Sequence, residues 1–399
     1  MANIDTPWFE SLKPEWKAGH EVQLLEGGQD YFSRLETCIV EAKDQIFLET
    51  YIFQDDASGR RIARALADAA DRGVRVHLVV DGFGTGQLMG EVLLMIKTSK
   101  VQLEVFRPER KFITLDRQRL RRLHRKLCVI DGEMAFVGGI NMLDDFFDPN
   151  HGVLEAPRFD FAVHVRGPLV SSVHLAMQRL WWELRLLRLK DRISIPDDVQ
   201  TNTKSDGNMR AMFVPRDNFR FRRTIEQNYL KAIGHARKEV FIANAYFFPG
   251  VRFRRALVAA ASRGVRVRLL LQGKVEYRLQ YYASQAMYDQ LLRAGIEIIE
   301  YKKSFLHAKV AVIDYWSTVG SSNIDPFSLL LAREANVVID NEAFAKQLRE
   351  ALEVGATEGG EPVLLQSHDK RSLPLRFVHW CSFVLLRAAV ALTGASGKY

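Results

Sequence analysis

Two short stretches of the chain repeat one set of residues that could carry out chemistry. Each has the spacing H-x-K-x4-D, stands at the head of an apolar run and continues through a glycine-rich step to an asparagine. The residues are His124, Lys126, Asp131 and Asn141 in the first stretch, and His307, Lys309, Asp314 and Asn323 in the second. One copy is most simply a strand-capping histidine beside a solvated lysine, but the repetition favours a catalytic site.

The doubled set limits what such a site could do. Two imidazoles that meet could act as a nucleophile and as a general acid and base. Two ammonium groups and two amides would hold an anion that has several oxygen atoms. These groups suit phosphoryl transfer through a phosphohistidine, with no cofactor and no metal ion needed to neutralise the phosphate.

Each motif is expected to lie on a β-strand. Side chains alternate between the faces of a strand, so the histidine and the lysine of each motif share a face. The two aspartates follow their histidines by seven residues, an odd offset. We therefore expect Asp131 and Asp314 to hydrogen-bond turns at the strand ends, although as parts of the motif they stay among the candidate catalytic residues.

Each motif strand is also expected to return as a hairpin. Asp131-Gly132 is a turn signal in the first copy. The second copy turns at Asp314-Tyr315 with one residue fewer, so its asparagine follows the histidine by 16 residues instead of 17.

The surrounding elements repeat in the same order. In the first half we expect strands at residues 22–25, 45–53 and 74–80 and helices at residues 31–42 and 60–72. In the second half we expect helices at residues 229–236 and 252–263 and strands at residues 239–247 and 265–271. The run Arg-Gly-Val-Arg-Val occurs in both, at residues 72–76 and 263–267. This repetition predicts two α/β halves of one fold, with the active site at their interface.

At these residues the sequence resembles the phospholipase D superfamily, whose signature is a pair of H-x-K-x4-D-x6-G-S/G-x-x-N motifs. Within it the chain looks most like the soluble bacterial cardiolipin synthases of the B type. Further stretches that carry the resemblance are residues 46–53, 242–250 and 318–326. The resemblance covers residues 20–345 and implies a duplicated phospholipase D-like α/β fold. It also implies a phosphatidyltransferase that moves a phosphatidyl group from phosphatidylglycerol, through a phosphohistidine, to a second phosphatidylglycerol and releases glycerol.

The resemblance implies roles for single residues. His124 would be the nucleophile and His307 the general acid and base, although the reverse assignment fits the sequence equally well. The phosphate oxygens would be bound by Lys126, Lys309, Asn141 and Asn323.

Two acidic residues stand downstream of the motifs, each at the start of an apolar run. Asp160 and Glu334 match a superfamily position whose carboxylate hydrogen-bonds the distal nitrogen of the histidine. Such a bond would fix the tautomer and support the imidazolium. The alternative is an exposed acid at the start of a strand.

The same residues leave other functions open. A hydrolytic phospholipase D would use them with water as the acceptor, and a phospholipase D-type nuclease would use them on DNA. A non-enzymatic membrane-binding protein would need a damaged motif, and both motifs are intact. The apolar tail and the run of residues 246–249 favour a lipid, so a nucleic acid partner is not expected.

The composition is that of a large globular enzyme. With 399 residues, 47% hydrophobic and 26% charged, the chain can bury a sizeable core. The net charge of +8, with basic stretches at residues 107–125 and 175–189, favours an anionic partner. Both stretches have ordinary alternatives, a solvated face and a core helix. Three scattered cysteines indicate a reducing compartment without disulfides or a metal site.

The chain is expected to divide into four segments. These are a first half at residues 1–190, a linker at 191–208, a second half at 209–345 and a tail at 346–399. In the tail, residues 373–392 are apolar but contain Arg376, His379 and Arg387, which argues against a spanning helix. We expect a helix lying in the membrane surface, with docking on the protein's own core equally open.

No signal peptide and no transmembrane helix are expected. The sequence therefore predicts a peripheral protein on the cytoplasmic face of the bacterial cell membrane. Its partners would be phosphatidylglycerol and the membrane surface, and its oligomeric state is open.

Overall fold

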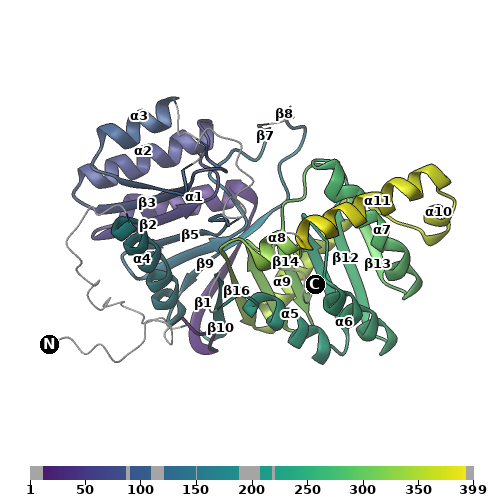
Figure 1. The fold of residues 1–399 in the computed structure, drawn as a ribbon. Helices are drawn as coiled ribbons and strands as arrows, with labels where there is room; N and C mark the ends of the chain where they lie inside the picture. The colour runs from purple at the N-terminus through teal and green to yellow at the C-terminus, as the bar shows by residue number, and fades with distance from the viewer. Residues whose placement is uncertain are drawn as a thin grey trace.

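One continuous mixed β-sheet of fifteen strands runs through the molecule, with helices on both faces (Figure 1). The computed structural model describes residues 12–86, 90–108, 121–149, 151–187, 207–217 and 221–391. Most of the linker expected at residues 191–208 and most of the basic stretch at residues 107–125 lie outside these ranges.

The first half of the sheet is built from residues 17–187. Its elements are β1 (Lys17–Glu26), α1 (Gly27–Glu41), β2 (Gln45–Thr50), α2 (Ala57–Asp71), β3 (Arg75–Asp81), α3 (Gly90–Thr98), β4 (Gln102–Phe106), β5 (Lys126–Ile130), β6 (Met134–Gly138), β9 (Phe161–Arg166) and α4 (Leu169–Leu187). The spatial order of its strands is β1-β9-β6-β5-β2-β3-β4. A separate small hairpin, β7 (Phe147–Asp148) with β8 (Gly152–Val153), leaves this half between β6 and β9.

The second half repeats this plan. Its elements are β10 (Met209–Arg216), α5 (Thr224–His235), β11 (Glu239–Asn244), α6 (Val251–Ser262), β12 (Arg266–Gln272), α7 (Arg278–Arg293), β13 (Glu297–Tyr301), β14 (Lys309–Ile313), β15 (Trp316–Gly320), α8 (Pro326–Leu330), β16 (Glu334–Asp340), α9 (Glu342–Gly359), β17 (Gly360–Pro362), α10 (Leu365–Asp369) and α11 (Leu373–Val390). The order β10-β16-β15-β14-β11-β12-β13 matches that of the first half, with β17 added at the edge. The expectation of a duplicated α/β fold is confirmed.

The two halves are joined edge to edge. β1 pairs with β10 in antiparallel register, with Lys17 opposite Ala211 and His20 opposite Met209. Figure 1 shows the halves side by side, the first in purple and blue and the second in green and yellow. Because each edge strand is paired, neither half exposes a free edge at this junction.

The repeated helices begin and end at recognisable signals. α2 begins where the Asp56 carboxylate accepts a hydrogen bond from Gly59 N at 2.8 Å. Gly73, at φ 100°, and Gly264, at φ 86°, follow α2 and α6 in the left-handed conformation that glycine adopts most easily. These are the glycines of the repeated Arg-Gly-Val-Arg-Val run, so the repeat marks one helix end in each half.

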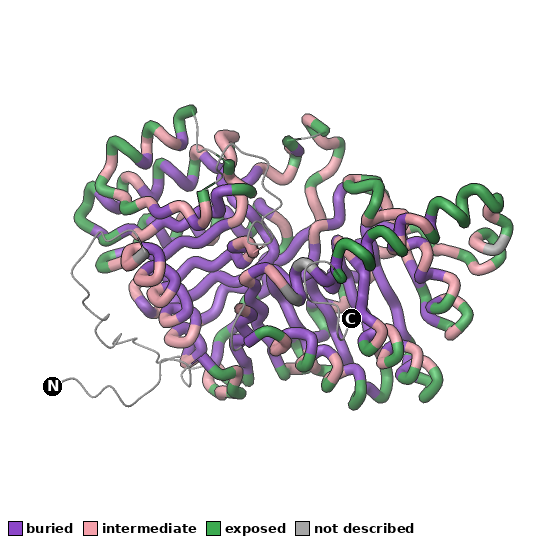
Figure 2. The backbone as a smooth tube through the Cα atoms, viewed as in Figure 1, coloured by how far each residue is buried: buried purple, intermediate pink, exposed green. Residues whose placement is uncertain are grey.

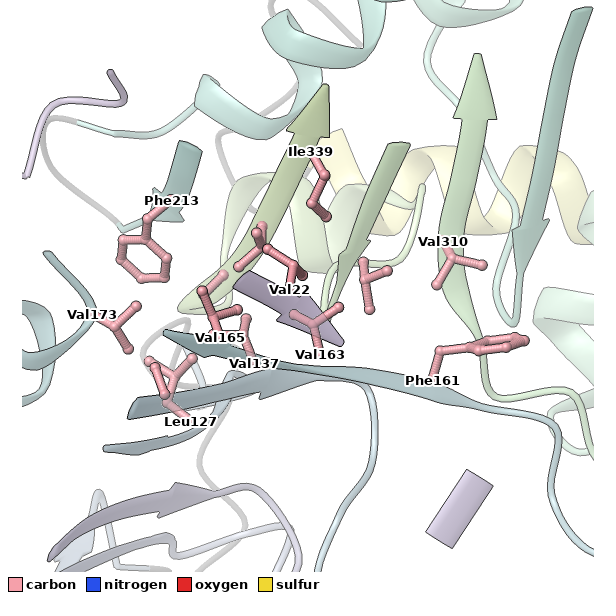
Figure 3. Close-up of a cluster of buried hydrophobic side chains, with 14 of the residues drawn as sticks. Val22, Leu127, Val137, Phe161, Val163, Val165, Val173, Phe213, Val310 and Ile339 are labelled. Carbon is pink, nitrogen blue, oxygen red and sulfur yellow. The ribbon is translucent and has the colours of Figure 1, made fainter. Parts of the chain in front are cut away.

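The central core packs between the halves. Leu127, Val163, Val310 and Ile339, from strands of both halves, lie in one cluster together with residues of α4 and α9 (Figure 3). The opposite faces of the strands pack on α1 and α2 in the first half and on α5 and α6 in the second. The motif strands are therefore buried on both faces, which explains why they are continuous apolar runs (Figure 2).

Both expected hairpins are present. Ile130 pairs with Met134 across the turn between β5 and β6, and Ile313 pairs with Trp316 across the turn between β14 and β15. The second turn is one residue shorter, as the spacing of the motifs predicts.

The second half continues beyond the boundary expected at residue 345. α9 crosses that position, and its buried residues Leu348 and Leu352 belong to the central cluster. β17 then pairs with β13. Residues beyond 345 therefore pack with the second half, through the apolar face of α9.

The tail forms α11, which packs against the protein along one face only. Leu386 contacts a small cluster with Phe248, Ala283 and Met287. The other face leaves Phe377 and Leu385 more than 60% exposed, and Figure 2 shows exposed segments along α10 and α11. By length and composition α11 could cross a membrane, and 22% of it is buried within the protein.

Candidate active site

The motif histidines lie at the junction of the halves because the backbone before each motif strand pairs with the other half. His124 N donates to Arg333 O at 3.0 Å, and Arg333 directly precedes β16. His307 N donates to Phe159 O at 2.9 Å, and Phe159 lies just before β9. Each histidine therefore stands beside the beginning of a strand of the opposite half.

The side chain of each motif histidine also contacts a residue of the opposite half. His124 Nδ1 lies 2.9 Å from Glu334 Oε1, and His307 Nδ1 lies 2.6 Å from Asp160 Oδ2. The sequence placed each acid downstream of its own motif, but in the structure each acid contacts the histidine of the other motif. The imidazole side chains are 16% and 20% exposed, so neither ring is completely buried.

The environment of the two pairs favours neutral imidazoles. Burial lowers the pKa of both His124 and His307. Burial would also raise the pKa of Glu334, but His124 and Lys126 outweigh it and hold this pKa below its usual value. The pKa of Asp160 is raised by burial to about 6. An ionised Glu334 accepts the Nδ1 proton of His124, which leaves a lone pair on Nε2.

The two motif lysines are buried cations. Lys126 is 2% exposed and Lys309 is fully buried. Lys126 Nζ donates to His124 O at 2.6 Å, and Lys309 Nζ donates to His307 O in the same way. Burial lowers the pKa of Lys126 to about 7 and that of Lys309 to about 8. An anion bound between them would favour their charged forms.

Each of the two motif asparagines bonds the protein backbone through its side-chain oxygen atom. Asn141 Oδ1 accepts from Ile52 N at 3.2 Å, and Asn323 Oδ1 accepts from Tyr246 N at 3.4 Å. Both residues are buried. These bonds orient each amide so that its NH₂ group is available as a donor to an oxygen of the substrate.

The motif aspartates have a different role from the one assigned to them as candidate catalytic residues. The Asp131 carboxylate accepts hydrogen bonds from the backbone N–H groups of residues 43, 44 and 45, and Asp314 accepts from those of residues 237, 238 and 239. Both have a positive φ, 51° and 53°. Seven residues of extended chain span about 20 Å, so these carboxylates are far from the histidines. The expectation of a turn role is confirmed.

Two contacts of the site were not expected from the sequence. Ser321 Oγ donates to Glu334 Oε2 at 2.5 Å, and the ring of Tyr51 packs against His124 with centroids 4.8 Å apart. In the first half Gly139 takes the place of Ser321, and a Cβ atom there would collide with the Asp160 carboxylate. The Gly-Gly and Gly-Ser steps of the motifs are the signal that could have indicated this difference.

The described residues contain no group of three or more His, Cys, Asp or Glu side chains that could hold a metal ion. The positive charges described at this site belong to the side chains of Lys126 and Lys309. The buried lysines lie beside the paired histidines, since the Nζ atom of each lysine donates to the backbone oxygen of the histidine in its own motif.

Comparison with solved structures supports the fold. The crystal structure of phosphatidylserine synthase from Haemophilus influenzae Rd KW20 superimposes with a TM-score of 0.65 at 11% identity, covering 97% of this chain and 98% of the other. Polyphosphate kinase from Porphyromonas gingivalis gives a TM-score of 0.55 at 12% identity, covering 93% and 53% of the two chains. At these identities the likeness concerns the fold.

Sequence comparison identifies the family. Cardiolipin synthase B of Escherichia coli (strain K12) is 36% identical over 353 residues, covering 86% of this chain and 81% of the relative. Cardiolipin synthase A of Pseudomonas entomophila (strain L48) is 28% identical, covering 89% and 72%. The family described as "Cardiolipin synthase, PLD-like domain" matches residues 35–154 and 229–354, one segment around each motif. The chain therefore belongs to the PLD-like cardiolipin synthase family.

Proposed function

We propose that this protein is a phosphatidyltransferase that makes cardiolipin from two molecules of phosphatidylglycerol and releases glycerol. The observation that supports the proposal is the pair of crossed histidine–carboxylate contacts, with a buried lysine bonded to the backbone of each histidine. The relatives named cardiolipin synthase support the choice of lipid.

In the first step, His124 Nε2 attacks the phosphorus atom of phosphatidylglycerol. The P–N bond forms as the bond between phosphorus and the glycerol oxygen breaks. His307 enters this step protonated and gives its Nε2 proton to the leaving glycerol. The bound phosphodiester is an anion, so it favours the protonated form of His307 that this step requires.

In the second step, the hydroxyl of another phosphatidylglycerol takes the place of glycerol. It gives its proton to His307 and attacks the phosphorus, and the P–N bond breaks to restore His124. Lys126, Lys309 and the two asparagine amides hold the non-bridging oxygens in both steps. No metal ion or cofactor takes part in this scheme.

The properties of Glu334, the acid that contacts His124, support the choice of His124 as the nucleophile. Glu334 is fully buried and bonded to Ser321, and its pKa is held below its usual value. An ionised carboxylate keeps the proton of His124 on Nδ1 and the lone pair on Nε2, which is the form that attacks phosphorus. The pKa of Asp160 is raised, so this carboxyl group is more easily protonated than Glu334. A protonated Asp160 would not hold the proton of His307 on Nδ1.

The membrane contact is proposed to run through α11, with the protein held peripherally on the cytoplasmic face of the cell membrane. Phe377, Trp380 and Leu385 expose apolar surface, while Arg376 and Arg387 offer positive charge to anionic headgroups. Because the opposite face of α11 packs on α7 and on Phe248, an in-plane orientation keeps these contacts.

The test is a product assay on liposomes that carry headgroup-labelled phosphatidylglycerol. Transfer yields one cardiolipin for each glycerol released, whereas hydrolysis yields phosphatidic acid with glycerol. His124→Ala and His307→Ala should each abolish turnover. His235→Ala, which removes an exposed histidine of α5, is the matched control and should retain it. Retained turnover in the double variant His124→Ala, His307→Ala would contradict the proposal.

A further inference from the structure

The two halves of the site differ at the position two residues after the end of β2 and of β11. Ile52 N donates to Asn141 Oδ1 and Tyr246 N donates to Asn323 Oδ1, so Ile52 and Tyr246 occupy equivalent positions. One position carries an aliphatic side chain and the other a phenol. At this position a hydroxyl group is therefore present in the second half only, whereas the first half places the phenol of Tyr51 against His124.

The phenol is bonded to a carboxylate of the same half. Tyr246 Oη donates to Glu276 Oε2 at 2.5 Å, and Glu276 lies in the segment between β12 and α7. Glu276 also interacts electrostatically with Lys309. Lys309 lowers the pKa of Glu276, and Glu276 raises the pKa of Lys309. The Tyr246–Glu276 pair therefore lies within electrostatic reach of Lys309, and the backbone of Tyr246 contacts Asn323 of the second motif directly.

A small cavity adjoins the pair. It has a volume of about 30 Å³ and is lined by Tyr246, Glu276 and Gln280 among others. The side-chain oxygen Oε1 of Gln280 is buried and has no hydrogen-bond partner among the described residues. This volume holds about one water-sized group, such as a single hydroxyl. The cavity thus presents acceptor oxygens and room for a donor.

Two kinds of headgroup could supply such a donor, a polyol or an ammonium group. The charged neighbours of Glu276 include the acid Asp148 as well as the cations Lys309 and Arg158. The two cations would repel an ammonium headgroup, and like charges repel strongly where water is scarce. A neutral hydroxyl meets no such cost and satisfies the amide and carboxylate oxygens equally well. The cavity's free acceptor oxygen and its single-hydroxyl size therefore suit a polyol, whose fit does not depend on the balance of these charges.

We propose that Tyr246, Glu276 and Gln280 form a subsite for one hydroxyl group of a polyol headgroup, on the side of the site that belongs to the second motif. This inference rests on the proposed function and extends it. It places the glycerol part of phosphatidylglycerol beside Lys309, and hence beside His307. The leaving or accepting oxygen would then lie next to His307, in agreement with its role as acid and base.

The test measures which alcohol captures the phosphatidyl group. Full-length protein is incubated with phosphatidylglycerol liposomes and an equimolar mixture of labelled glycerol and labelled 1-propanol, and both products are quantified in one reaction. A parallel mixture replaces 1-propanol with ethanolamine. The ratio of the two products is unaffected by a partly unfolded sample, because both come from the same active molecules.

In the wild-type protein we expect glycerol to be captured at least 10-fold more than 1-propanol, and more than ethanolamine. Glu276→Gln and Tyr246→Phe should each lower the glycerol-to-propanol ratio about 10-fold, as expected when a buried polar contact to a substrate hydroxyl is lost. Tyr282→Phe removes a phenol from α7 outside the cavity and should leave the ratio unchanged.

The outcomes separate this inference from the proposed function. An unchanged ratio in both variants, while the wild-type protein still makes cardiolipin, would overturn the polyol subsite alone. Preferential capture of ethanolamine by the wild-type protein would also overturn it, since the cavity would then bind an ammonium group. Absence of any turnover of phosphatidylglycerol by the wild-type protein would overturn both.

Discussion

His124 Nδ1 and Glu334 Oε1 lie 2.9 Å apart although 210 residues separate them in the chain. The equivalent contact joins His307 to Asp160, 147 residues away. Each half thus provides the histidine of one pair and the acid of the other. Neither half therefore has a complete site of its own. A movement of one half against the other would disturb both histidine–acid pairs at once.

The first prediction concerns the crossed acids. Glu334→Gln should lower kcat by about 10²- to 10⁴-fold, because an amide in place of the carboxylate no longer holds the Nδ1 proton of His124 and cannot support the imidazolium. Single-turnover assays of phosphatidylglycerol cleavage would measure this. Glu361→Gln, at an exposed ion pair with Lys302, is the control and should behave as wild type. A change in KM without a change in kcat would argue against the orienting role.

The second prediction concerns pH. Since burial lowers the pKa of Lys126 to about 7 and that of Lys309 to about 8, both ammonium groups lose their charge as the pH rises through these values. We therefore expect kcat/KM to fall above about pH 7, because the free enzyme binds phosphate less well. A pH profile of Lys126→Arg should shift this fall to higher pH, since arginine stays charged. An identical alkaline limb in this variant would assign the fall to another group.

The third prediction separates stability from chemistry in the motif. Asp131→Ala removes the acceptor of three backbone N–H groups. It should lower the free energy of unfolding by about 2 kcal/mol, because these donors lose their charged partner but can still reach water. Denaturant unfolding would measure this, and kcat of the folded fraction should change less than twofold. Asp71→Ala, at the end of α2, serves as the control. A large loss of kcat at unchanged stability would restore Asp131 to the catalytic set.

The fourth prediction concerns α11. The double variant Phe377→Ser, Leu385→Ser removes two side chains that are more than 60% exposed. Each apolar side chain is worth about 1–2 kcal/mol on burial, so the loss of two should weaken binding to liposomes by about 30- to 1000-fold. Sedimentation with phosphatidylglycerol vesicles at high salt would measure this, since salt suppresses the electrostatic part. Val40→Ser removes an exposed valine of α1 and should not affect binding. Equal losses in both variants would exclude a specific role for α11.

The local features of the fold follow from the sequence. The H-x-K spacing, the turn at each motif aspartate and the order of strands and helices depend on side-chain periodicity and on turn residues within a few positions. For this reason the hairpins after residues 130 and 313 and the ends of α2 and α6 were predictable. The presence of one motif in each half was predictable as well, because the motif and the elements around it occur twice in the sequence.

The pairing between the halves was decided by the tertiary structure. Nothing near Glu334 in the sequence shows that its partner is His124, because this contact depends on how β1 and β10 join the two sheets. The same holds for Tyr246 and Glu276, which lie in different loops and meet only when β11 and β12 stand side by side. Local patterns determine which residues each half offers, whereas the packing of the halves determines which atoms meet.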